Sequence, residues 1–455
     1  MCSLADPKQT DLGTGSVTKL VFKLALPAVT AQVINLLYNI VDRIYIGNMP
    51  GVGDVALTGV GVTFPIIMII SAFSAFVGMG GAPLAAIRMG AGDNEGAERI
   101  LGNGVLMLGV ISVTLTILFS LFKDPLLMAF GASENTLPYG SAYLGIYLLG
   151  TIFVQFALGL NTFISAQGFA TTAMLSVLFG AVTNIVLDPI LIFGFNMGVS
   201  GAATATVISQ AFSAIWVVRF LSSSKSILRI RWKSLRFDRK LAMSMAALGV
   251  SPFVMQATES AVQIILNSGL QRYGGDMYVG TMTICLSILQ LIIMPAQGFS
   301  QGAQPIISYN YGANKPQRVR KAFGVMLTFS LSFSCLGWAA CQFFPHILAR
   351  IFTPKAELIE LTAQVLPIFM FGIFMFGCQM ACQSTFLALG QAKVSLFIAL
   401  LRKIILLIPL AILLPMRFGV LGIYYSEPIA DIVAATTTII LFACSIRKIL
   451  STEIS

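Results

Sequence analysis

The feature that most constrains this chain is a set of long stretches without a charged residue. No Lys, Arg, Asp or Glu occurs in residues 55–87, 100–122, 189–218, 277–314, 322–349 or 361–392. Each stretch exceeds the roughly 20 apolar residues that a helix needs to cross a bilayer. Transmembrane β-strands instead alternate apolar and polar residues over about 10 positions. The sequence therefore predicts membrane-spanning helices.

Composition excludes most other classes of protein. Of the 455 residues, 57% are hydrophobic and only 10% are charged. Soluble domains have about 45–50% apolar and about 25% charged residues, so this chain has too little charge to cover a water-facing surface. A soluble enzyme, a disordered chain and a disulfide scaffold are excluded. The polar first 18 residues do not follow the charged-then-apolar pattern of a cleaved signal peptide, and we expect the first span to be retained.

We predict an all-α polytopic membrane protein with twelve transmembrane helices in two pseudo-symmetric six-helix lobes. The expected spans are 20–46, 56–84, 97–122, 139–165, 170–194, 199–221, 240–269, 278–304, 318–345, 361–388, 393–415 and 419–445. The expected parts are an N-terminal cytoplasmic tail (1–18), an N-lobe (19–221), a basic cytoplasmic linker (222–239), a C-lobe (240–446) and a C-terminal cytoplasmic tail (447–455).

The two lobes are inferred from an internal repeat at a shift of about 222 residues. Gly80-Gly81-Ala82-Pro83 aligns with Gly302-Ala303-Gln304-Pro305, and Ala166-Gln167-Gly168 aligns with Ala388-Leu389-Gly390. Six spans per half is an even number, so both halves enter the membrane from the same side as parallel repeats. Such a duplication is typical of transporters that alternate access to a central pathway. A duplication that serves packing alone is the alternative.

The net charge of +10 follows the sides of the membrane. Twenty of the 28 Lys and Arg residues fall on the two ends of the chain and on the even-numbered loops, with a cluster from Arg219 to Lys240. This is the positive-inside pattern with both termini cytoplasmic. We therefore expect a multi-pass protein of the bacterial inner (plasma) membrane, surrounded by lipid, and no binding of nucleic acid.

Cysteine and histidine do not form a catalytic or metal-binding pattern. The seven cysteines lie mostly within spans, and Cys378 and Cys382 share a helix face without a nearby His or carboxylate. The only histidine, His346, lies beside Pro345 at a helix end. We expect no enzyme activity, no metal and no cofactor. The glycine-rich stretches lack the Gly-Lys-Ser/Thr of a nucleotide-binding loop, so an ion gradient must supply the energy.

Five carboxylates fall inside spans, where burial in lipid costs several kcal/mol and function is the default hypothesis. They are Asp42, Asp188, Glu259, Glu427 and Asp431. Asp42 and Asp188 both lie roughly 27–29 Å into outward-running helices at about 1.5 Å per residue. Asn184 is one turn before Asp188, and Tyr143 and Thr206 lie near the same depth. These groups could hold Na⁺ through oxygen ligands or share a proton. A polar network that only joins helices is the alternative.

The second half contains a different set of ionisable residues. Glu427 and Asp431 are spaced by one helical turn, and the eleventh span brings Arg402 and Lys403 to mid-membrane. A buried network of ion pairs among Arg402, Glu427 and Asp431 is the simplest interpretation. Glu259 has no obvious basic partner near its depth, and we expect either a contact with a cationic substrate or second ion, or simple packing.

These residues together resemble the multidrug and toxic compound extrusion (MATE) family, in its bacterial MepA/DinF-like branch. The resemblance extends from about Lys19 to Lys448. Besides the duplication, it rests on Leu26-Pro27 with Asp42, on Arg88-Met89-Gly90-Ala91-Gly92-Asp93, on Asn184 with Asp188-Pro189, on Gly201-Ala202-Ala203-Thr204-Ala205-Thr206, and on Arg402 with Pro428-Ile429-Ala430-Asp431.

The resemblance implies two six-helix lobes around a large cavity and efflux of cationic amphipathic drugs, as xenobiotic transport, against H⁺ or Na⁺. It would make Asp42, Tyr143, Asn184, Asp188 and Thr206 the coupling-cation site. Another branch uses carboxylates in spans seven and ten. Glu259 approximates the first, but span ten has no acid, which favours coupling through the N-lobe. Small organic cations are the expected partners, and a monomer the expected functional form.

Four other functions fit parts of the pattern. A lipid-linked precursor flippase would require a cationic cavity, against which the N-lobe acids argue. A channel does not need duplicated lobes with buried acids, and a membrane-embedded aspartyl protease does not explain the duplication. An exporter of an unidentified metabolite would share every feature named above.

Overall fold

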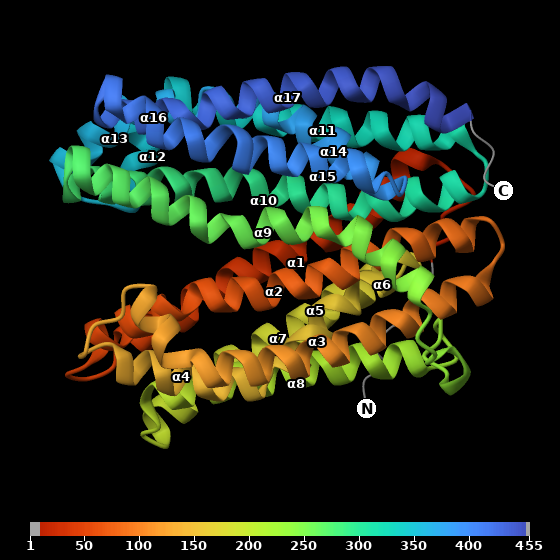
Figure 1. The fold of residues 1–455 in the computed structure, drawn as a ribbon, viewed down its shortest axis with the longest axis horizontal. Coiled ribbons are helices and arrows are strands. Elements are labelled where there is room, and N and C mark those ends of the chain that lie inside the picture. Colours follow the sequence, from red (N-terminus) through yellow and green to blue (C-terminus); the bar gives the residue numbers. More distant parts are fainter. Residues whose placement is uncertain (1–9, 452–455) are drawn as a thin grey trace. The chain divides into compact units, whose positions relative to one another are not determined.

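The computed structural model describes residues 10–451, and within that range every regular element is a helix (Figure 1). In chain order the elements are α1 (Val17–Gly47), α2 (Gly53–Gly90), α3 (Asn94–Ala129), α4 (Leu137–Leu149), α5 (Thr151–Gly159), α6 (Asn161–Ala166), α7 (Ala170–Pro189), the π-helix η1 (Ile190–Gly194), α8 (Gly198–Ser222), the 3-10 turn η2 (Trp232–Ser234), α9 (Arg239–Gly274), α10 (Asp276–Gly312), α11 (Pro316–Phe343), α12 (Pro345–Phe352), α13 (Ala356–Phe369), α14 (Ile373–Ala388), α15 (Ala392–Leu400), the π-helix η3 (Leu401–Leu407), α16 (Ile408–Phe418) and α17 (Val420–Ser451).

The described helices confirm the predicted all-α membrane fold. Ten are long and apolar enough to cross a membrane, and two bent helix pairs raise the number to twelve if each pair forms one span. The predicted boundaries hold within a few residues for most spans, although α12 was not predicted and α17 continues to Ser451. Residues 1–9 and 452–455 of the two predicted tails lie outside the described residues.

The fourth and tenth spans are bent, where the sequence predicted single helices. The chain turns by 61° between α4 and the α5–α6 segment, at Gly150. A Cβ on Gly150 would approach the Val207 side chain to 2.5 Å, so the missing side chain lets α8 pack against the bend. The turn between α13 and α14 is 49°, and it follows Pro367, which cannot donate a hydrogen bond to the preceding turn.

The chain divides into two compact units, and the boundaries between them do not coincide with the predicted linker. Unit 1 contains Thr30–Gln256, and unit 2 contains Leu12–Val29 together with the chain from Ala257 onwards. The first part of α1 therefore groups with unit 2, and the first part of α9 groups with unit 1. The lobe limits 19–221 and 240–446 stay a prediction about the extent of each repeat.

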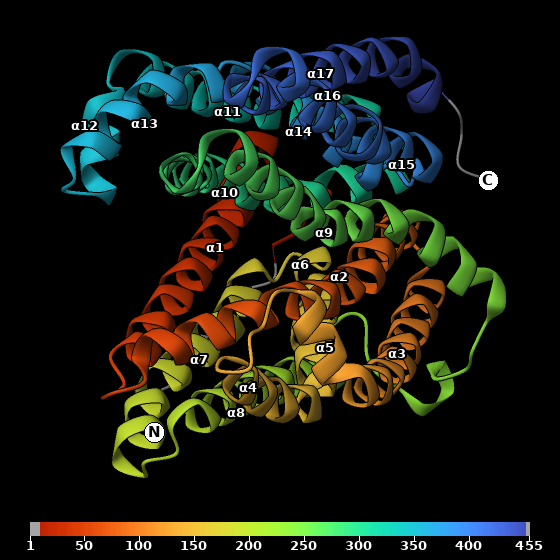
Figure 2. The same cartoon turned by 60° about the vertical axis from the view of Figure 1, so that its left-hand side comes forward.

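Each unit is a helix bundle with its own apolar core (Figure 2). In unit 1, α2 packs against α3 and α5, and α7 packs against α8. In unit 2, α11 packs between α10 and α14, and α17 covers α14 and α16. The polar side chains buried inside unit 1 are held by these helix contacts, and they form the candidate site.

Candidate cation site

Four helices of unit 1 carry the residues that the sequence predicted as a cation site. They are Asp42 on α1, Tyr143 on α4, Asn184 and Asp188 on α7, and Thr206 on α8. The Asp188 side chain is completely buried, Asn184 is 1% exposed, and Asp42 is half-buried. All five belong to the same compact unit, so the bundle brings together residues up to 164 positions apart in the sequence.

Asp188 lies at the point where α7 stops being a regular α-helix. Pro189 has no N–H to donate and its ring crowds the preceding turn. The π-helix η1 begins at the next residue, Ile190. Short π-helical segments change the register of backbone hydrogen bonds and are frequent at functional sites. A local irregularity of the backbone is therefore present directly beside the carboxylate.

The polar side chains contact one another through the Asn184 amide. Asn184 Nδ2 donates to Asp188 Oδ1 at 3.2 Å and lies 3.5 Å from Thr206 Oγ1. The Thr206 hydroxyl donates to the Ala202 carbonyl in its own helix at 3.0 Å. Tyr143 lies beside Thr206, and both Tyr143 and Asp188 are close enough to Asp42 for electrostatic interaction.

Three oxygen atoms in this cluster are buried without a hydrogen-bond partner in the described chain. They are Asp42 Oδ1, Asn184 Oδ1 and Asp188 Oδ2. A buried polar atom without a partner is destabilising, and a buried carboxylate oxygen more so. A bound proton, a Na⁺ ion or a water molecule would remove that deficit. Carboxylate and amide oxygens are hard donors, which suits these occupants and not a soft metal.

The positive charge nearest to the site in sequence points to an aromatic ring. The Arg43 guanidinium lies 5.5 Å from the centre of the Phe64 ring, in a cation–π contact. No ion pair of Arg43 with Asp42 or Asp188 occurs among the described residues. The same part of the chain contains no group of three or more His, Cys, Asp or Glu side chains placed to hold a metal ion. Within residues 10–451 the two acids thus have no salt-bridge partner, although Arg43 lies close enough to Asp42 to interact with its charge.

Unit 2 contains a second buried cluster, in which charges are paired. Arg402 donates to Asp431 Oδ1 at 2.7 Å and to Glu427 Oε1 at 2.9 Å, and its guanidinium lies 4.6 Å from the centre of the Phe376 ring. The structure therefore joins the three residues predicted as an ion-pair network. Arg402 lies in the π-helix η3, which no sequence signal indicated.

The expectation that Glu259 has no basic partner was wrong. Lys403 Nζ lies 2.6 Å from Glu259 Oε2. Glu259 lies on α9 and Lys403 in the π-helix η3, 144 positions further along the chain, so only the folded chain shows that the two side chains meet.

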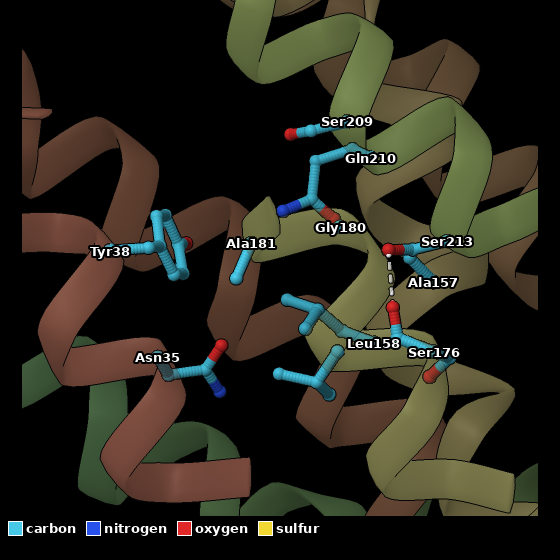
Figure 3. Close-up of a pocket in the computed structure, with 11 residues that line it drawn as sticks. Asn35, Tyr38, Ala157, Leu158, Ser176, Gly180, Ala181, Ser209, Gln210 and Ser213 are labelled. Atoms are coloured by element: carbon cyan, nitrogen blue, oxygen red, sulfur yellow. Dashed lines mark hydrogen bonds between the residues drawn. The ribbon is translucent and has the colours of Figure 1, made fainter. Parts of the chain in front are cut away.

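A small pocket in unit 1, about one helical turn from the cation site, was not predicted from the sequence, and its lining combines apolar and polar side chains (Figure 3). Its polar lining residues are Asn35, Tyr38, Ser176, Ser209, Gln210 and Ser213. Serines are common in membrane helices as small packing residues, so single serines carry no signal. The available signal was their spacing: Ser209 and Gln210 follow Thr206 by about one turn on α8, and Tyr38 precedes Asp42 by one turn on α1.

Comparison with known protein families identifies the family of this chain. The sequence matches the MatE family over residues 27–190 and again over residues 252–413, one match in each half of the chain. The chain belongs to the MatE family. A MatE member is a multi-pass membrane transporter, so the chain is a transporter and the channel and protease interpretations are set aside.

Curated relatives extend over almost the whole chain. It is 26% identical over 424 residues to the multidrug export protein MepA of Staphylococcus haemolyticus (strain JCSC1435), with 92% of both chains covered. It is 24% identical over 429 residues to the MepA of Staphylococcus aureus (strain NCTC 8325 / PS 47), with 93% of both covered. This MatE chain is thus similar over more than nine-tenths of its length to proteins named as multidrug exporters.

Solved structures agree with the fold of this MatE chain. A crystal structure of MATE in the straight conformation superposes with a TM-score of 0.90 at 24% identity, and covers 98% of this chain and 100% of that one. The same TM-score and coverage hold for an outward-facing multidrug resistance MATE transporter of the MOP superfamily. They hold also for a Pyrococcus furiosus transporter whose reported pocket of reverse polarity suggests a different function for that protein.

Proposed function

We propose that this chain is a secondary active antiporter, which exports cationic amphipathic compounds in exchange for H⁺ or Na⁺ by alternating access. The observation that carries the proposal is the set of three partnerless buried oxygens on Asp42, Asn184 and Asp188. Two acids without a salt-bridge partner form a site whose charge changes when a cation binds. Such a change is what couples an ion gradient to a second ligand.

The coupling mechanism uses charge neutralisation. When H⁺ or Na⁺ occupies the site at the outer side, the negative charge that attracts a cationic compound falls and the compound is released. The carrier returns, loses the ion to the cytoplasm and binds the compound again. Exchange of one H⁺ or Na⁺ for one monovalent cationic compound moves no net charge, so the concentration gradient of the coupling ion supplies the energy. At about 1.4 kcal/mol per tenfold change, a tenfold gradient of the ion sustains about a tenfold gradient of the compound. Import of a second ion would move one net charge, worth about 2.3 kcal/mol at 100 mV.

Orientation and substrate class belong to the same proposal. The excess of Lys and Arg on the chain ends and even-numbered loops supports a bacterial plasma-membrane protein with both termini cytoplasmic. The names of the MepA relatives support export of several drugs, and the proposed working form is a monomer in lipid. The alternative substrates are a lipid-linked precursor and an unidentified metabolite.

Ethidium uptake into everted vesicles tests the proposal. Vesicles energised by a pH gradient should take up ethidium, and Asp188→Asn should reduce uptake to the level of vesicles without the protein. The matched control is Asp54→Asn, because Asp54 is an exposed acid at the start of α2 in the same unit. Replacing the pH gradient with a Na⁺ gradient then identifies the coupling ion.

Two outcomes would contradict parts of the proposal. Full transport by Asp188→Asn would overturn the assigned cation site while leaving an antiporter. No ethidium transport under either gradient would overturn the proposed substrate class and favour the lipid-linked precursor or the unidentified metabolite.

A further inference from the structure

A row of polar side chains follows the contact between α7 and α8 away from the cation site. The row, here called the α7–α8 polar row, consists of Asp188, Asn184, Thr206, Ser209, Ser213, Ser176 and Asn161. From Asp188 to Ser176 it extends over 12 residues of α7, about 18 Å along the helix axis. A polar row of this length inside an apolar bundle needs a physical reason.

The helices approach closely along this row because one residue has no side chain. A Cβ on Gly180 of α7 would overlap the Ser213 hydroxyl of α8. With glycine at that position, Ser213 Oγ reaches across and donates to the Ser176 carbonyl at 2.8 Å. The contact is made by two polar groups where an apolar pair would seal the interface equally well.

The pocket opens beside this row and is bounded on its other side by α1. Figure 3 shows Asn35 and Tyr38 of α1 on one side and Gln210 and Ser176 on the other, with Ala181 and Leu158 between them. Its volume of about 30 Å³ exceeds the roughly 10–15 Å³ that one water molecule requires. The side-chain amides of Asn35 and Gln210 form no hydrogen bond to other described residues. Two amides without protein partners, facing a cavity of this size, are groups that water or a hydrated ion would bind.

The pocket lies about one helical turn from the cation site on α1 and α8. Tyr38 is four residues before Asp42, so both side chains lie on one face of α1. On the opposite wall, Ser209 donates to the Thr206 carbonyl at 2.8 Å, and Thr206 borders the cation site. The same three helices, α1, α7 and α8, therefore line both the site and the pocket.

Polar contacts continue from the pocket to the beginning of α7. Ser176 Oγ lies 3.2 Å from Asn161 Oδ1, and Asn161 Nδ2 donates to the carbonyl of Ala173 at 3.2 Å. Ala173 is the fourth residue of α7, whose first turn lies at the cytoplasmic end in the proposed orientation. Hydroxyl and amide groups thus extend from Asp188 to within one turn of that end.

We propose that the pocket is an inner station for the coupling cation, through which it passes with water from the Asp42–Asp188 site to the cytoplasm. This inference rests on the proposed antiport. For H⁺, the O–H bond of the protonated Asp188 carboxyl breaks, the proton moves to water in the pocket, and the carboxylate remains. Serine hydroxyls both donate and accept, so Ser209, Ser213 and Ser176 can stabilise the hydrated proton or Na⁺ on its way. Without such groups a charge would cross apolar helix packing at high cost.

The test measures the rate of ethidium exchange and the affinity for ethidium separately, because a blocked route for the cation lowers only the rate. Gln210→Leu and Ser209→Ala remove polar groups of the station but none of the cation site. In proteoliposomes with a pH or Na⁺ gradient, each should lower steady-state ethidium exchange, and the double variant about tenfold or more. In detergent, the dependence of ethidium affinity on pH and on Na⁺ should equal that of the wild type, because a binding equilibrium does not depend on the path.

Controls keep a folding defect apart from a blocked route. Ser112→Ala removes another buried serine of unit 1, whose hydroxyl donates to Gly109 in its own helix as Ser209 does to Thr206, and its exchange rate should be unchanged. Gln210→Asn keeps an amide and should recover part of the rate lost in Gln210→Leu. Normal ethidium affinity in detergent would show that each variant is folded.

Two results would overturn the inference, and they differ from failure of the proposed function. Wild-type exchange by the double variant would remove the pocket from the route. An altered pH or Na⁺ dependence of ethidium affinity in detergent would make these residues part of the cation site itself. Failure of the antiport proposal would appear instead in the wild type, as ethidium affinity and exchange that do not depend on pH or on Na⁺.

Discussion

The two side chains of the Glu259–Lys403 ion pair differ in their exposure. Removing one charge or the other should therefore change the free energy of unfolding by different amounts. The Lys403 side chain is 8% exposed, whereas the Glu259 side chain is 44% exposed. If Lys403 is removed, the carboxylate is left only partly enclosed by protein. If the charge of Glu259 is removed, a buried ammonium loses its partner. An uncompensated buried charge is far more costly than an exposed one.

We therefore predict that Glu259→Gln destabilises the protein more than Lys403→Met. The free energy of unfolding should fall by about 2 kcal/mol for Glu259→Gln and by clearly less for Lys403→Met. The double variant should be more stable than Glu259→Gln alone, because it removes the stranded ammonium. Thermal unfolding of the four purified proteins in one detergent measures these differences. Greater destabilisation by Lys403→Met would contradict the asymmetry.

Single residues could be predicted from the sequence when they stood out chemically. Asp42 and Asp188 did so, because an acid in a long apolar run is costly without a role. Asn184 followed from its helical spacing to Asp188. Gln210 and Ser209 did not stand out, because uncharged polar residues are ordinary in membrane helices, and only the contact between α7 and α8 shows their alignment. Lys403 stood out as a base inside a span, but its contact with Glu259 joins residues 144 positions apart and could not be predicted from the sequence.

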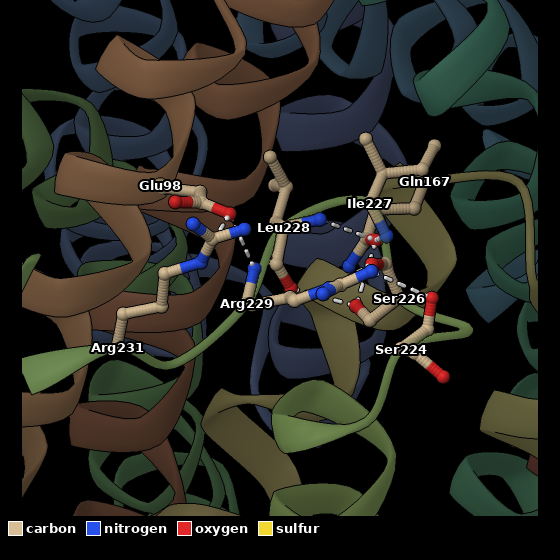
Figure 4. A network of polar contacts seen from close by, with 8 residues as sticks. All are labelled: Glu98, Gln167, Ser224, Ser226, Ile227, Leu228, Arg229 and Arg231. Carbon is tan, nitrogen blue, oxygen red and sulfur yellow. Dashed lines mark hydrogen bonds and ion pairs between the residues drawn. The ribbon is translucent and has the colours of Figure 1, made fainter.

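Among the elements, the linker between α8 and α9 is held by side chains of unit 1, of which Gln167 accepts three hydrogen bonds (Figure 4). The oxygen of Gln167, at the end of α6, accepts hydrogen bonds from Ser226 Oγ at 2.9 Å, from the Ile227 amide at 2.8 Å and from the Leu228 amide at 3.0 Å. Glu98 of α3 accepts a further one from the Arg229 amide at 3.2 Å. The sequence predicted a basic linker here but no ordered path for it.

Removing the Gln167 oxygen should release the linker. Gln167→Ala leaves the buried Leu228 amide without a partner, which costs about 1–3 kcal/mol. We expect trypsin to cleave at Arg229 and Arg231 markedly faster than in the wild type, as seen by gel after limited digestion of the purified protein. Gln167→Glu keeps an acceptor oxygen and should resist trypsin like the wild type. Equal cleavage of all three proteins would show that Gln167 does not hold this segment.

At the scale of the whole molecule, two glycines at equivalent positions of the sequence repeat each allow a close contact between helices. Gly80 and Gly302 occupy the same position in the two halves. A Cβ on Gly80 would overlap the Met245 carbonyl of α9, and a Cβ on Gly302 would overlap the Ala25 backbone of α1. Gly80, in the first half of the sequence, thus leaves room for the beginning of α9, the first helix of the second half. Gly302, in the second half, leaves room for the beginning of α1, the first helix of the first half. The twelve spans and the duplication could be predicted from apolar runs and repeated motifs, but this exchange depends on packing between distant segments and could not.

The exchange predicts that equivalent glycines are equally intolerant of a side chain. Gly80→Ala and Gly302→Ala each force backbone movement in a packed interior and should lower the free energy of unfolding by about 1–3 kcal/mol. Gly109→Ala and Gly324→Ala are the controls, since a Cβ there meets nothing within 4 Å, and alanine should stabilise these helices by up to about 1 kcal/mol. Melting temperatures in detergent should therefore move in opposite directions for the two pairs. A loss confined to one of Gly80 and Gly302 would mean that the two halves do not hold their exchanged helices in the same way.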